Sequence, residues 1–74
     1  MIVTGTCIGV QKVGGAVMFA VPVKAIKPES HATASIWFRY AGLDRNSLVT
    51  GDDYNLQVSI HDSPRQYEVV RIVR

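Results

Sequence analysis

The chain has a single cysteine, Cys7, and no apolar run near the roughly 18–20 residues that a membrane-spanning helix needs. One cysteine excludes an internal disulfide framework and is typical of a reducing compartment, so we expect a cytoplasmic protein with a buried, inert thiol. No basic segment precedes the apolar residues that follow Met1, so the sequence predicts no signal peptide. These absences argue against a membrane partner.

Charged residues are also scarce. They make up 19% of the 74 residues, 47% are hydrophobic, and the formal net charge is +2. This is the composition of a globular chain, and its length predicts one small domain over residues 1–74. A mild positive charge permits a polyanionic partner but is far below that of a protein that coats DNA.

The usual groups of catalytic and metal-binding residues are missing. Neither His31 nor His61 has a cysteine or carboxylate beside it at the spacing of metal ligands. Cys7 lies in a predicted strand without an obvious base, and the pair Asp52 and Asp53 is typical of a turn. We therefore expect a protein that is not an enzyme and needs no cofactor or metal.

Short apolar and β-branched runs, separated by turns rich in Gly, Pro and Asp, predict an all-β chain. Pro22 cannot donate a ladder hydrogen bond, so the strand containing it should end at an edge or a bulge. The adjacent Val69 and Val70 indicate a bulge in the last strand. The expected strands cover residues 3–10, 16–23, 35–40, 54–61 and 67–73, with polar connections over 24–33 and 43–53.

Residues 30–42 are open to a second interpretation. Ser30 can cap a helix and Gly42 can close one. The β-branched and aromatic residues between them favour a strand instead. With the strand, the five elements and the longer connection after the third predict a small Greek-key barrel of the oligonucleotide-binding (OB) type, whose closure removes exposed strand edges.

The stretch Ser35 to Tyr40 holds the only tryptophan of the chain. In a strand, Ile36 and Phe38 would face the core while Trp37 and Arg39 stand on the outer face, because side chains alternate. A flat ring beside a planar cation can stack on a nucleobase and hold a phosphate. The alternative is that Trp37 is a half-buried aromatic residue of an ordinary small barrel.

The sequence resembles the cold-shock domain in three places. The opening pattern of that family, T-G-T-V-K-W-F-N-x-x-K-G-F-G-F-I, is similar to residues 4–19. Its V-F-V-H-F-S-A-I motif is similar to residues 36–43, and its E-G-Q-x-V-x-F-x-V pattern to residues 50–58. Residues 16–21, with the later turn at Gly51, also resemble bacterial translation initiation factor one. Both resemblances imply an OB-type barrel that binds RNA or single-stranded DNA and acts in transcription or translation.

The cold-shock resemblance also implies which residues bind. Positions that stack bases in the first motif of that family carry Ala16 and Met18 here, and its first-strand Lys and Trp fall on Ile8 and Gly9. Each lost stack would remove about 1–3 kcal/mol of binding free energy. The candidate nucleic-acid-binding residues are Trp37, Arg39 and Tyr40 from the second motif, Met18 from the first, and the nearby cations Lys12 and Lys24.

The same substitutions support a different partner. Ile8, Ala16 and Met18 would make a flat apolar surface beside Trp37 and Arg39. Met, Trp and Arg are enriched at protein interfaces, and an exposed apolar patch on a small protein usually has a partner. A barrel that binds a protein of the transcription or translation machinery is therefore the alternative hypothesis, unless these residues only enlarge the core.

Overall fold

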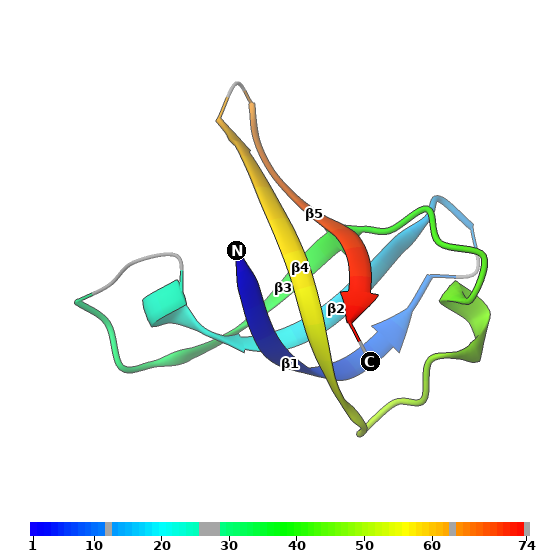
Figure 1. Ribbon diagram of the computed structural model, residues 1–74, viewed down its shortest axis with the longest axis horizontal. Coiled ribbons are helices and arrows are strands. Elements are labelled where there is room, and N and C mark those ends of the chain that lie inside the picture. The colour runs from blue at the N-terminus through cyan, green and yellow to red at the C-terminus, as the bar shows by residue number, and fades with distance from the viewer. Residues whose placement is uncertain (12, 26–28, 63, 74) are drawn as a thin grey trace.

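Five strands form a closed barrel in the computed structural model, which describes residues 1–11, 13–25, 29–62 and 64–73 (Figure 1). Around the barrel the strand order is β1-β2-β3-β5-β4, and only the β3–β5 contact is parallel. This arrangement confirms the predicted all-β Greek-key barrel and matches a small OB-like fold. The elements are β1 (Ile2–Val10), β2 (Ala16–Pro22), the 3-10 turn η1 (Val23–Ala25), β3 (Thr33–Arg39), the 3-10 turn η2 (Arg45–Ser47), β4 (Asp53–Asp62) and β5 (Arg65–Val73).

The segment that was open to two interpretations is a strand. β3 pairs with β2 along its whole length, from Thr33 opposite Pro22 to Arg39 opposite Ala16. The β-branched and aromatic residues of β3 therefore prevail over the helix signals of Ser30 and Gly42. Within the ranges that the structure describes, no helix is long and apolar enough to cross a membrane.

The first turn and the end of β2 follow the sequence prediction. Gly14 and Gly15 both have positive φ, at 102° and 72°, which a residue with a side chain rarely adopts. Pro22 is the last residue of β2, and the pairing of β2 with β1 stops before it, at Ala20. Pro22 therefore lies where no ladder to β1 needs its missing N–H group.

The barrel interior is filled by side chains from every strand. Its centre is Phe19, whose ring meets those of Phe38 and Tyr54 edge to face, with centroids 5.9 and 6.3 Å apart. Cys7 is also buried in the barrel interior, and this burial raises the pKa of its thiol above the ordinary value. The buried hydrophobic residues of this core are Cys7, Val17, Phe19, Val21, Phe38, Tyr40, Leu48, Leu56, Val58 and Val69.

A bulge in β1 changes which residues face outward. Cys7 lies opposite Phe19 and the next pair is Gly9 with Met18, so Ile8 has no partner in the ladder to β2. Ile8 keeps the outward direction that alternation gives it and is 40% exposed, but the alternation breaks after it. Gly9 pairs with the outward Met18, and Val10 packs against the core instead of facing outward.

A second bulge lies in β5, where the sequence predicts one. Gln57 of β4 pairs with Arg71 and the next residue pairs with Val69, so Val70 is skipped. Val70 is accordingly exposed while Val69 is buried. The adjacent valines thus mark the bulge correctly.

The weakest part of the barrel wall is the contact between β3 and β5. These strands share a single paired position, Arg39 with Glu68, whereas β4 and β5 pair from Asp62 and Arg65 to their far ends. In Figure 1 the β4–β5 hairpin leans away from β3 and extends beyond the rest of the barrel. Arg39 and Glu68 therefore mark the position at which β3 and β5 meet.

Candidate nucleic-acid interface

Three apolar side chains, Ile8, Met18 and Trp37, come together on the outer face of β1, β2 and β3. Met18 lies opposite Trp37 in the β2–β3 ladder and opposite Gly9 in the β1–β2 ladder. The bulge places Ile8 next to this row, and Gly9 adds no side chain to it. We call Ile8, Met18 and Trp37 the apolar patch.

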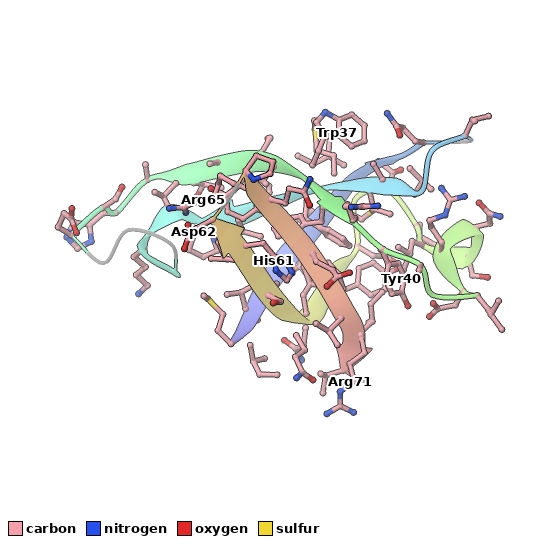
Figure 2. The ribbon with its side chains drawn as sticks, turned by 90° about the horizontal axis from the view of Figure 1, so that it is seen from above. Trp37, Tyr40, His61, Asp62, Arg65 and Arg71 are labelled. Atoms are coloured by element: carbon pink, nitrogen blue, oxygen red, sulfur yellow. The ribbon has the colours of Figure 1, made fainter. Side chains whose placement is uncertain are left out.

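Trp37 is the most prominent member of the patch. Its side chain is 48% exposed, and in Figure 2 it projects from β3 away from the barrel. The strand dictates this direction, because Ile36 and Phe38 on either side face the interior. The exposed ring offers an apolar surface on which a flat group can stack.

Arg39 lies on the same face as Trp37, two residues further along β3. Alternate residues of a strand are about 6.4–6.8 Å apart, so a group stacked on the Trp37 ring would lie within reach of the guanidinium. Arg39 is exposed, and its Nη1 lies 3.5 Å from Oε1 of Gln66, the limit of a hydrogen bond. A contact this long holds the guanidinium only loosely in place.

Tyr40 occupies a different position from the one that the resemblance implies. Its side chain is only 6% exposed, and its hydroxyl donates a hydrogen bond to Oδ1 of Asp44. β3 ends at Arg39, and the alternation along the strand turns Tyr40 inward with Phe38. A base cannot lie flat on a buried ring, so we leave Tyr40 out of the proposed interface.

Of the two predicted lysines, the structure describes Lys24, and it lies away from Trp37. Lys24 is exposed in η1, beyond the pair of Pro22 and Thr33. Thr33 lies four residues from Trp37, about 13 Å along the strand, on the side away from Arg39. Lys24 can therefore reach only a ligand that extends along β2 and β3, and Lys12 lies outside the described residues.

The other described arginines are engaged elsewhere. Arg65 forms an ion pair with Asp62, Nε to Oδ1, at 2.8 Å. Arg71 donates from Nε to Oε1 of Gln57 at 2.7 Å, and Figure 2 shows it on the side opposite Trp37. Arg45 donates to the carbonyl oxygen of Gln11. Arg39 is thus the described arginine that lies beside the apolar patch.

Sequence reasoning did not identify a polar groove on the other side of Arg39. The groove has a volume of about 320 Å³ and lies where β5 diverges from β3. The alternation of side chains along β4 and β5 predicts that every second residue of these strands points outward. The sequence alone does not show that β5 pairs with β3 and so brings these residues next to Arg39. The lining residues are Arg39, His61, Pro64, Gln66 and Glu68.

Within the described part of the chain, no group of three or more His, Cys, Asp or Glu residues is placed to hold a metal ion. The chain matches no family model, no curated protein and no solved structure.

Proposed function

We propose that this barrel binds single-stranded RNA or DNA through Trp37 and Arg39. The observation that carries the proposal is the exposed Trp37 ring on the outer face of β3, with Arg39 two residues away on the same face. OB-type barrels bind oligonucleotides on the face of their second and third strands. A base would stack on Trp37, and Arg39 would contact the adjacent phosphate. A role in transcription or translation is the context that the cold-shock resemblance implies.

The composition of the face limits the affinity. One stacking ring contributes about 1–3 kcal/mol, and among the described residues Arg39 is the cation beside it. Sequence-independent binding through phosphates typically gives dissociation constants of about 1–100 µM at physiological salt. We expect weak binding to a short stretch of single strand, with Met18 contributing apolar contact beside the base.

Replacing Trp37 with Ala should weaken the binding of short oligo-U and oligo-dT by about 1–3 kcal/mol, or roughly 5- to 150-fold. The ring is half exposed, so the fold should survive its loss. The anisotropy of labelled oligonucleotides measures the affinity without depending on tryptophan fluorescence. Circular dichroism checks the fold.

Two further variants serve as controls. Trp37→Phe keeps an aromatic ring and should retain part of the affinity, whereas Val70→Ala removes an apolar side chain of similar exposure from the β5 bulge and should change nothing. Equal affinities for Trp37→Ala and the unchanged protein would contradict the proposal.

A protein partner is the second candidate, favoured by one feature of the same face. Ile8 and Met18 flank Trp37 with apolar rather than basic groups. A nucleic acid gains little from aliphatic neighbours, while the centre of a protein interface is apolar and depleted of charge. The barrel would then bind a component of the transcription or translation machinery through the apolar patch.

The variant Met18→Asp distinguishes a protein interface at the apolar patch from non-specific capture. The carboxylate would be desolvated at the centre of the patch, so partners recovered from nuclease-treated lysate with the unchanged protein should be lost. Gln57→Asp places the same charge on the outer face of β4 and should leave the recovery unchanged. Recovery of the same proteins with Met18→Asp would contradict an interface at the apolar patch.

A further inference from the structure

The polar groove beside Arg39 carries more specific chemistry than the apolar patch. One wall is the outer face of the β4–β5 hairpin, where His61 pairs with Gln66 in the ladder and the ring of His61 approaches Glu68, Nε2 to Oε1 at 3.5 Å. The other wall is Arg39, which is the β3 partner of Glu68. The groove therefore gathers a carboxylate, an amide, a guanidinium and an imidazole around one hollow of about 320 Å³.

The two central groups of the groove are the amide of Gln66 and the carboxylate of Glu68. Gln66 accepts from Nη1 of Arg39 through its amide oxygen, which leaves the amide NH₂ to donate to a ligand. The carboxylate of Glu68 lies 3.5 Å from Nε2 of His61, and its residue pairs with Arg39 in the ladder, so the carboxylate faces the groove as an acceptor. The groove thus presents a carboxylate acceptor beside an amide donor.

This arrangement is complementary to the Watson–Crick edge of guanine. Guanine has two neighbouring donors, N1–H and N2–H₂, which a carboxylate accepts together, and an adjacent acceptor, O6, which an amide NH₂ satisfies. Adenine and cytosine each present one donor next to a ring-nitrogen acceptor, and uracil has its single donor between two carbonyls that would repel a carboxylate. Of the four bases, guanine alone offers two adjacent donors.

Size and position agree with a single base. A volume of about 320 Å³ is at the lower end for ligand sites and suits one base. Pro64 provides an apolar surface at one end of the groove. The same Arg39 and Glu68 also line a second hollow of about 280 Å³ near Gly14 and Gly15, so the groove is one part of a longer depression.

We propose that the groove formed by Arg39, His61, Pro64, Gln66 and Glu68 binds a guanine base, with Glu68 accepting from N1–H and N2–H₂ and Gln66 donating to O6. The proposal rests on the proposed function and deepens it. Arg39 lies between the groove and Trp37, so a strand with one base on the ring and its phosphate at Arg39 can place a nearby guanine in the groove. The barrel would then prefer single strands that contain guanine.

The test compares short oligo-U with the same oligomer carrying one central guanosine, inosine or adenosine. Guanosine should bind about 5- to 10-fold more tightly than adenosine, the lower part of the range for a bidentate base contact because the groove is open. Inosine lacks the N2 amino group and should fall between them. Equal affinities for guanosine and adenosine would overturn the proposal while leaving Trp37-dependent binding of oligo-U intact.

Glu68→Gln tests the assigned contact. The amide can donate where the carboxylate only accepts, so the guanosine-to-adenosine ratio of affinities should fall below about 2-fold. Glu29→Gln removes the same charge from the exposed loop between β2 and β3 and should keep the full ratio. A preference for guanosine that persists in Glu68→Gln would overturn the assignment of Glu68.

Free mononucleotides test the groove independently of the Trp37 face. If no oligomer binds, the proposed function fails. A titration with guanosine monophosphate, followed by NMR, still tests whether the groove binds guanine. Shifts of the Gln66 and Glu68 amides with guanosine monophosphate, but not with adenosine monophosphate, would support the site. Identical responses to the two nucleotides, or none to either, would overturn it.

Discussion

Replacing Phe19 with Ala is expected to lower the free energy of unfolding by about 3–5 kcal/mol. The side chain is 0% exposed and its ring contacts those of Phe38 and Tyr54, so its removal leaves a cavity between three strands. A 74-residue chain has a total stability of about 4–11 kcal/mol at roughly 0.05–0.15 kcal/mol per residue. The variant should therefore lose a large fraction of the total stability.

Urea unfolding followed by circular dichroism measures this loss. Phe19→Leu retains most of the volume and should cost less than Phe19→Ala. Val70→Ala shortens an exposed side chain and should stay within about 0.5 kcal/mol of the unchanged protein. A change below about 1 kcal/mol for Phe19→Ala would contradict the central position of this ring, since buried Phe truncations cost several times more.

Gly42→Ala is expected to destabilise the barrel by about 2–4 kcal/mol, although it adds only a methyl group. A Cβ atom at this position would lie 2.6 Å from Cε1 of Tyr40 and closer still to Cζ and the hydroxyl oxygen. The ring must move, which costs about 1–3 kcal/mol for overpacking and also disturbs the hydrogen bond from Tyr40 to Asp44.

Gly9→Ala is the matched control for Gly42→Ala. No atom lies within 4 Å of a Cβ built at Gly9, so the added methyl group enters open space and should not destabilise the fold. Thermal unfolding of both variants gives the comparison. Equal melting temperatures for the two would show that Tyr40 does not pack against Gly42 as described.

The order and extent of the strands could be predicted because each carries a local signal. The alternation of Tyr54, Leu56 and Val58 marks one face of β4, and these residues do pack into or against the core. The paired valines mark the bulge in β5, and the β-branched and aromatic residues decide β3. These signals depend on neighbours in the chain and need no tertiary information.

The features that sequence reasoning missed depend on contacts between distant segments. The bulge at Ile8 is visible only once β1 is aligned with β2, and the burial of Tyr40 depends on the packing of the chain after β3. The groove needs β5 to pair beside β3 at Arg39 and Glu68, positions 29 residues apart. A prediction based on one strand at a time cannot place such residues together.

Trp37 fluorescence, titrated with short oligo-dT and oligo-U at several salt concentrations, tests the central claim most directly. Trp37 is the only tryptophan, so a base that stacks on it should quench the emission of the whole protein. The account predicts quenching whose midpoint weakens with salt, with a logarithmic slope of about −0.7 for each phosphate contact. No quenching at about tens of micromolar oligonucleotide, where binding through phosphates is normally visible, would contradict it.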